Sequence, residues 1–388
     1  MSAGVISAHA AQGGGRDLRL DFFRGLALIF IFLNHIPGNA MSWLSSRNFG
    51  FSDATEIFIF ISGYSVILAY GGVIDRQGFL PLTARIWRRA WQVYAAHIFL
   101  FVVFVAHISY VSERFNPAFA EEMNIGEIFE APHTLMFQAL ILAFKPANMD
   151  VLPLYIVLLA VFPPVIVLLK RQPAWVLAGS FLLWLAVQYR HWNLPAYPDG
   201  AWFFNPFAWQ LLFIVGGWCA LRRDAAPWRR IPPRLGLGLS LAYLLFALAI
   251  VATWTYSPWA VYVPVWLRQI LYPIDKTELD VLRLLHFLAL AYVVVVVVRP
   301  GAAFLGSWAA RPFIICGRHS LQIFCTGVFL SFLGHFILSE VNSSLGMQVG
   351  VSLAGIALLV GLAATISWYD RASGKRGGGS RTAGSVTS

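Results

Sequence analysis

Asp21-Phe-Phe-Arg24-Gly-Leu-Ala-Leu-Ile-Phe-Ile-Phe-Leu-Asn34-His35 is an apolar run with an arginine near one end and a histidine near the other. It predicts a buried helix. Eleven residues separate Arg24 from His35, so both side chains return to nearly the same face, roughly 16 Å apart along the axis. Ionisable groups inside a membrane helix are costly and indicate function, although both groups could also snorkel to the helix ends or cap them.

The composition predicts the class of fold. The chain has 388 residues, of which 59 % are hydrophobic and 12 % are charged, whereas soluble domains carry about 25 % charged residues. Several runs reach the roughly 20 apolar residues that cross a bilayer. We therefore expect an all-α, polytopic membrane helical bundle. The net charge of +10 is explained by the distribution of basic residues over the loops, so no nucleic-acid partner is expected.

Hydrophobic periodicity predicts about ten membrane spans in one bundle that covers residues 19–370. The segment 133–144 is too short to cross, which leaves an interfacial or a re-entrant placement. Residues 1–18 and 371–388 are predicted to be disordered cytoplasmic tails. The predicted spans are 20–38, 53–72, 88–110, 151–170, 174–190, 205–221, 235–256, 281–299, 315–338 and 348–369.

The basic residues predict the orientation. In a ten-span topology, twenty of the twenty-eight Lys and Arg fall on the side of the N-terminus, and Arg24 lies within the first span. Because basic loops stay in the cytoplasm, both termini are predicted to be cytoplasmic. The seven basic residues on the opposite side are Arg47, Arg114, Lys145, Arg190, Arg268, Lys276 and Arg283.

Two carboxylates begin the second span. Asp53 and Glu56 are three residues apart and share a helix face, and a short loop joins them to His35. A carboxylate beside a histidine fixes its tautomer and stabilises the imidazolium, as a general base requires. The alternative is that Asp53 caps the helix and Glu56 lies in its first turn.

Further polar groups lie near both ends of the predicted spans. Arg88 and Arg89 precede the third span on the inner side, where such residues determine topology, bind anionic lipid or hold the phosphates of a donor. Groups at the outer ends could form an acceptor pocket or anchor the helices in the interface. These groups are Asp150, Tyr155, Gln210, Arg283 and His286. The sequence contains no P-loop, dinucleotide or metal motif.

These motifs resemble a known family. The Arg24–His35 spacing and Phe58-Ile-Phe-Ile-Ser62-Gly63-Tyr64 are similar to signatures of the membrane acyltransferase-3 superfamily. Within it, the chain resembles the OpgC type from residue 19 to about 330. One departure is Gly327, near a position where broader members carry a histidine. The matching segments are Asn48-Phe-Gly-Phe-Ser-Asp53, Asn148-Met-Asp150-Val-Leu-Pro-Leu-Tyr155, Asn205-Pro-Phe-Ala-Trp-Gln210, Leu285-His286-Phe-Leu and Gly317-Arg318-His319-Ser320.

The resemblance implies an acyltransferase of the bacterial inner membrane. It would move an acyl group, expected to be succinyl, from cytoplasmic acyl-CoA to a hydroxyl of a periplasmic glucan or other envelope glycan, without metal or cofactor. His35, oriented by Asp53 or Glu56, would either act as general base toward an acceptor hydroxyl or take the acyl group transiently. Arg24, Arg88 and Arg89 would hold the donor in this scheme. The acceptor would contact Asp150, Tyr155, Gln210, Arg283 and His286.

Two other functions remain open. Cationic and histidine groups inside spans also suit a secondary transporter or flippase for an anionic solute or a lipid-linked sugar. A non-catalytic partner of a glucan synthase would need none of the buried groups. For the enzyme we expect one polar cavity leading from Arg24 and Arg88 to His35. Succinyl and the glucan come from the resemblance alone, since the residue patterns by themselves do not identify the acyl group or the acceptor. The oligomeric state is not predicted.

Overall fold

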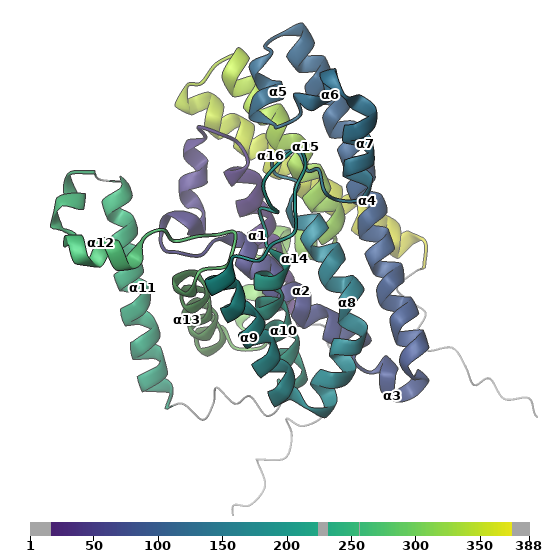
Figure 1. Cartoon of the computed structure of the whole chain (residues 1–388), viewed down its shortest axis with the longest axis vertical. Coiled ribbons are helices and arrows are strands. Elements are labelled where there is room, and N and C mark those ends of the chain that lie inside the picture. The colour runs from purple at the N-terminus through teal and green to yellow at the C-terminus, as the bar shows by residue number, and fades with distance from the viewer. Residues whose placement is uncertain (1–16, 224–231, 256, 375–388) are drawn as a thin grey trace, which may run out of the picture.

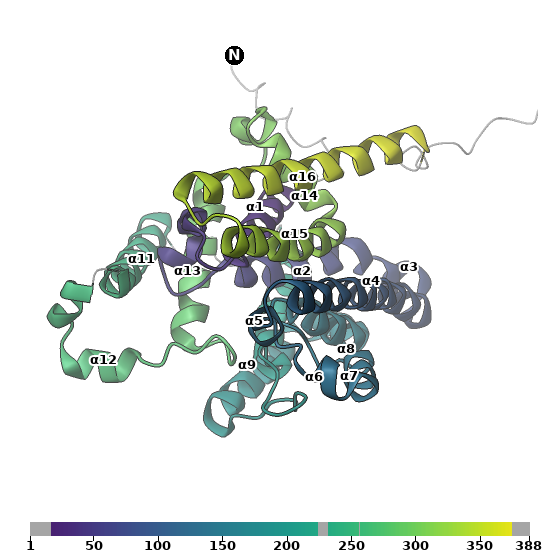
Figure 2. The ribbon, with the colours of Figure 1, turned by 90° about the horizontal axis from the view of Figure 1, so that it is seen from above.

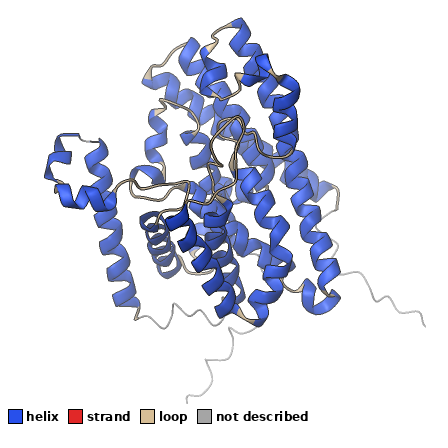
Figure 3. Ribbon diagram, viewed as in Figure 1, coloured by secondary structure: helices blue, strands red, loops and turns tan. Residues whose placement is uncertain are grey.

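The helices of a computed structural model coincide with all ten predicted spans (Figure 1). The structure describes residues 17–223, 232–255 and 257–374, and regular secondary structure in these ranges is helical, apart from an isolated bridge between Pro195 and Ala201 (Figure 3). The helices that match the spans are α1 (Leu18–Asn34), α2 (Ala54–Tyr70), α4 (Phe79–Arg114), α8 (Val151–Arg171), α9 (Pro173–Arg190), α10 (Pro206–Leu221), α11 (Pro233–Thr255), α13 (Val281–Val297), α15 (Ser320–Glu340) and α16 (Leu345–Ala372).

Shorter helices connect these elements. The predicted span 315–338 is divided, because α14 (Arg311–Arg318) ends before His319 and α15 begins after it. The remaining short helices are α3 (Val73–Gln77), α5 (Ala118–Glu122), α6 (Glu127–Glu130), α7 (Pro132–Leu140) and α12 (Val265–Leu271), with 3-10 turns η1 (Ala40–Leu44), η2 (Ser46–Asn48), η4 (Ser257–Tyr262) and η5 (Ala303–Gly306).

The chain is a multi-pass membrane protein. Six helices of the described residues are long and apolar enough to cross a bilayer: α2 continued by α3, α4, α8, α11, α15 and α16. The apolar helices α10 and α13 are shorter, and α1 and α9 carry more polar residues. Ten spans and cytoplasmic termini therefore remain predictions. Residues 1–16 and 375–388, which make up most of the predicted tails, lie outside the described residues.

The short segment at 133–144 contains α7, which descends beside α4 (Figures 1 and 2). At its C-terminal end the carbonyl of Leu140 accepts a hydrogen bond of 2.8 Å from the Tyr94 hydroxyl, near the middle of α4. The chain then turns back toward the start of α8. Both the re-entrant and the interfacial placement stay predictions.

Paired glycines bring the central helices into close contact. A Cβ atom on Gly25 of α1 would lie 1.8 Å from the Phe313 carbonyl oxygen of α14, and one on Gly317 would lie 1.9 Å from the Asp21 carbonyl oxygen. Gly63 and Gly216 make the same reciprocal contact between α2 and α10. Small residues allow such close approach in membranes, where packing drives helix association. The hairpin of α1 and α2 is thus clamped on both sides.

The first prediction concerns this contact. Gly25→Ala should force α1 and α14 apart, because the added methyl group meets backbone and not a flexible side chain. Overpacking of this kind costs about 1–3 kcal/mol, so the melting temperature of the detergent-solubilised protein should fall. Gly361→Ala in α16 is the matched control, since nothing lies within 4 Å of its added Cβ. Equal melting temperatures for the two variants would contradict the clamp.

Candidate active site

A cavity of about 560 Å³ is lined mainly by five segments, with Arg47 of η2 and Asn124 at its edge. These segments are the end of α1, the start of α2, and the loops 141–150, 191–205 and 272–280. Cavities of about 300–1,000 Å³ are typical of small-molecule sites. We call it the outer cavity, because the predicted topology places it on the outer side. Its polar lining includes Asn34, His35, Arg47, Asp53, Thr55, Asn124, Lys145, Asn148, Asp150, Tyr197, Asp199 and Lys276.

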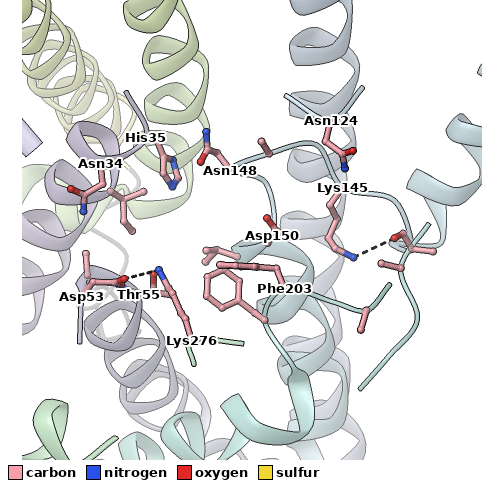
Figure 4. A pocket seen from close by; sticks show the side chains of 18 of the residues that line it. Asn34, His35, Asp53, Thr55, Asn124, Lys145, Asn148, Asp150, Phe203 and Lys276 are labelled. Carbon is pink, nitrogen blue, oxygen red and sulfur yellow. Dashed lines mark hydrogen bonds and ion pairs between the residues drawn. The ribbon is translucent and has the colours of Figure 1, made fainter. Parts of the chain in front are cut away.

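His35 caps the C-terminal end of α1, and its backbone N–H donates to the carbonyl of Ile31 over 3.0 Å. Its side chain lines the outer cavity and remains partly exposed (Figure 4). The Nδ1 atom is buried without a hydrogen-bond partner among the described residues. The predicted carboxylate–histidine pair is not formed.

The two carboxylates are engaged elsewhere, in a capping box at the start of α2. Asp53 accepts from the Thr55 backbone over 2.8 Å, and Glu56 accepts from the Asp53 backbone over 2.9 Å. Asp53 also pairs with Lys276 at 2.6 Å, and fully buried Glu56 pairs with Arg283 at 2.6 Å. The structure therefore shows the capping alternative, extended by two ion pairs.

Arg283 and His286 do not line the outer cavity, contrary to the predicted acceptor contact. Arg283 is buried against Glu56, and its Nη2 lies 3.4 Å from Asp53. His286 Nδ1 lies 2.7 Å from the hydroxyl of buried Ser52. Both residues belong to α13, so they fix the chain that leads into α2. Their position indicates support of the cavity floor.

Arg24 lines a second, smaller cavity of about 150 Å³, which we call the inner cavity. Arg89 and Tyr155 line it too, whereas Tyr155 was predicted on the acceptor side. Arg24 donates to the carbonyl of Ile61 over 3.3 Å and to the hydroxyl of Ser65. An arginine pair beside hydroxyl groups can bind phosphate.

Two of the predicted substrate-binding residues lie at neither cavity. Arg88 is exposed on α4 and is not part of the inner lining. Gln210 of α10 bonds to Ser180 of α9, with the Ser180 hydroxyl donating over 2.7 Å and Gln210 Nε2 donating back to the Ser180 carbonyl over 2.9 Å. Gln210 thus braces two helices.

The two cavities share no lining residue among those that the structure describes, and the apolar rings of Phe58 and Phe324 lie in the wall of the inner one; we call this pair the apolar layer. The continuous passage from Arg24 to His35 stays a prediction. Along α2, Thr55 lines the outer cavity and Phe58, one turn later, lines the inner one. Phe58 packs against Phe324 of α15 with ring centroids 6.1 Å apart, and both rings are buried. Arg24 and His35 therefore face different compartments of the same bundle.

Two charged groups of the loop 141–150 face the outer cavity (Figure 4). Burial lowers the pKa of Lys145 to about 8, against the opposing effect of the Asp150 charge. Burial likewise raises the pKa of Asp150 to about 6, and the charge of Lys145 opposes this shift. Asn148, between them in sequence, has a left-handed backbone with a φ of 68°. The loop thus presents two desolvated, oppositely charged groups.

Sequence reasoning missed Lys145 and Lys276 as site residues. Both stand among the few basic residues predicted outside, against the trend of the chain. Arg47 of the same small set also lines the cavity. Basic residues on the outer side contribute nothing to positive-inside topology, so their presence there was a usable signal.

Fold and cavities together define the class: a multi-pass helical membrane protein with polar cavities that are lined by residues from distant parts of the chain. Within this class the chain belongs to the OpgC family, since the family described as OpgC protein matches residues 16–371. Membership implies a glucan-modifying transferase. Neither the curated proteins nor the solved structures contain a match to the chain.

The second prediction concerns the buried pair of Glu56 and Arg283. Removing one partner leaves an uncompensated buried charge, which costs about 3–5 kcal/mol. Glu56→Gln and Arg283→Met should each lower the melting temperature strongly, and the double variant should lose less than the sum of both. Additive losses would mean that the two side chains do not stabilise each other.

The third prediction concerns Asp150 and pH. Its pKa is raised from 3.8 to about 6, so between these values the folded state binds more protons than the unfolded state. The free energy of unfolding should therefore fall as the pH rises from about 4 to 6. Asp150→Asn should remove this loss, which melting curves at acid and neutral pH would show. Asp199→Asn is the control at an exposed carboxylate of the same cavity. An unchanged pH dependence in Asp150→Asn would contradict the assignment.

Proposed function

We propose that the chain is an O-acyltransferase of the bacterial inner membrane, which moves an acyl group from cytoplasmic acyl-CoA to a hydroxyl of a periplasmic glucan. The observation that carries this proposal is the placement of Arg24 and His35. Arg24 lies in α1 and His35 caps the C-terminal end of α1, yet the two residues line cavities that share no described lining residue. Such an arrangement suits a donor and an acceptor that arrive from opposite sides of a membrane.

The proposed step joins the acceptor hydroxyl to the thioester. The hydroxyl oxygen forms a bond to the acyl carbonyl carbon while its proton passes to the His35 ring. The carbon–sulfur bond then breaks, and the departing thiolate takes up a proton to leave as CoA. A positioned histidine contributes about 10²–10⁴-fold to such proton transfers. Because no carboxylate among the described residues bonds to the ring, the acceptor hydroxyl and the cavity wall would have to orient it.

The donor would bind at the inner cavity. Arg24 and Arg89 supply cationic groups for phosphate or thioester-side oxygen atoms, and Ser62, Ser65 and Tyr155 supply hydroxyl groups. For the acyl carbon to reach His35, the rings of Phe58 and Phe324 must part. The inner cavity of 150 Å³ is smaller than a typical ligand site, so donor binding and opening of this layer would be coupled.

The acceptor would bind at the outer cavity. Asp150 and Asp199 can accept hydrogen bonds from sugar hydroxyl groups, and Asn148 can donate and accept. The rings of Tyr197 and Phe203 line the same space and offer apolar faces to a sugar. These groups can bind a neutral glycan. Such a glycan does not require the positive charges of Lys145 and Lys276, which line the same cavity.

A secondary transporter is the second candidate, because two cavities with separate linings also fit alternating access. The two functions differ in the fate of the acyl group. A transporter would move an anionic solute or a lipid-linked sugar without forming an ester.

The fourth prediction tests the enzyme. Inverted inner-membrane vesicles expose the cytoplasmic face, so labelled succinyl-CoA added outside should acylate a glucan enclosed within. His35→Ala should lower this transfer by at least about 10²-fold, since it removes the base. Arg24→Lys should also impair transfer severely, because an ammonium lacks the planar fork of donors.

His133→Ala is the control, because His133 lies exposed on α7 away from both cavities. Transfer by well-inserted His35→Ala at the rate of this control would exclude the catalytic role. Movement of label into the vesicles without esterification would favour the transporter. Acylation in vesicles of the opposite orientation alone would reverse the predicted topology.

A further inference from the structure

Lys145 is a buried cation in the wall of the outer cavity. Its side chain is 8 % exposed, and its Nζ atom donates to the carbonyl oxygens of Leu142 at 3.0 Å and Ala143 at 3.4 Å. The Nζ atom also lies 4.0 Å from the centre of the Trp202 ring. These contacts position the ammonium group, but carbonyl dipoles and an aromatic face do not neutralise its charge.

The second lysine of the cavity shows the contrast. Lys276 forms an ion pair with Asp53 at 2.6 Å. Among residues 17–223, 232–255 and 257–374, no carboxylate forms an ion pair with Lys145. Asp150 lines the same cavity but forms no ion pair with Lys145. Its negative charge raises the pKa of Lys145, whereas burial lowers this pKa by more.

A buried charge without a counterion is costly. An anion bound in the cavity would compensate the charge of Lys145 and so lower this cost. An ammonium group has three N–H donors. Two of them are directed at the carbonyl oxygens, which leaves one for a ligand in the cavity. A neutral sugar hydroxyl could accept this hydrogen bond but would leave the charge uncompensated. A carboxylate satisfies both needs.

We propose that Lys145 binds a carboxylate at the far end of the transferred acyl group and thereby selects dicarboxylic acyl donors. This inference rests on the proposed acyl transfer. His35 and Lys145 line one cavity from different segments, and Figure 4 shows them at opposite sides of it with Asp150 and Asn148 between. An acyl chain that reacts beside His35 would extend across the cavity, with its free end toward Lys145.

The position of Trp202 strengthens the specificity argument. Its ring covers one side of the ammonium group and lies in an apolar setting, being 4 % exposed. Water is thereby limited around the bond between lysine and carboxylate, which strengthens a charge-assisted hydrogen bond. An acyl group that ends in a methyl would leave Lys145 unpaired, and such a mismatch is a strong basis for discrimination.

The fifth prediction compares two donors of equal chain length in the vesicle assay, succinyl-CoA and butyryl-CoA. The full-length wild-type protein should prefer succinyl-CoA. Lys145→Met should lower transfer from succinyl-CoA by about 10–100-fold, the value expected for one charge-assisted hydrogen bond, and should leave transfer from butyryl-CoA nearly unchanged. Lys145→Arg should retain the preference in part, because the charge is kept.

The ratio of the two rates within one variant does not depend on how much of that variant folds. Lys170→Met is the matched control, since Lys170 pairs with Asp75 at the opposite end of the bundle. An equal loss with both donors would place Lys145 at the acceptor or in the support of the fold, and would overturn the inference. An unchanged ratio in Lys145→Met would do the same. If the wild-type protein transfers neither acyl group, the proposed function fails first, whereas equal transfer of both by the wild type refutes only the role of Lys145.

Discussion

The buried ion pair between Glu56 and Arg283 is the interaction on which the site depends. It joins α2 to α13, although 227 residues separate the partners, and Glu56 is fully buried. Each charge alone would be costly in this setting. Because Arg283 also approaches Asp53, and Lys276 completes the pairing, the first turn of α2 is held in place by residues from two distant segments. The floor of the outer cavity is thus held in shape by close ion pairs between residues that are far apart in the sequence.

Local sequence patterns predicted the helices well, because the length of an apolar run and the charged residues that flank it can both be read from neighbouring positions. Even the separation of Arg24 and His35 along α1 followed from helix geometry. The partners of Asp53 and Glu56 could not be predicted in this way. Both carboxylates satisfy a local capping pattern and a histidine hypothesis equally well, and only the tertiary approach of Arg283 and Lys276 decides between them.

The basic residues that the topology predicts on the outer side were more informative about the site than their small number suggested. Four of the seven, Arg47, Lys145, Lys276 and Arg283, line or support the outer cavity. Charges that set the orientation gather on the cytoplasmic side, so basic residues predicted on the other side indicate a different role. By contrast, Gln210 and His286 are polar groups in apolar helices that brace the packing, with Ser180 and Ser52 as partners. The residues that surround Gln210 and His286 in the sequence are as apolar as those around a site residue, so the sequence alone does not distinguish the two roles.

The pair of Phe58 and Phe324 also has an electrical meaning. If water fills the two cavities from opposite sides of the membrane, much of the membrane potential would fall across the short distance between them. Moving one elementary charge through the full potential involves about 2.3 kcal/mol per 100 mV. In a membrane that is negative inside, the potential favours the outward movement of an acyl carboxylate past the two rings and opposes the outward movement of a proton. The apolar layer would therefore favour the outward passage of an anionic acyl group.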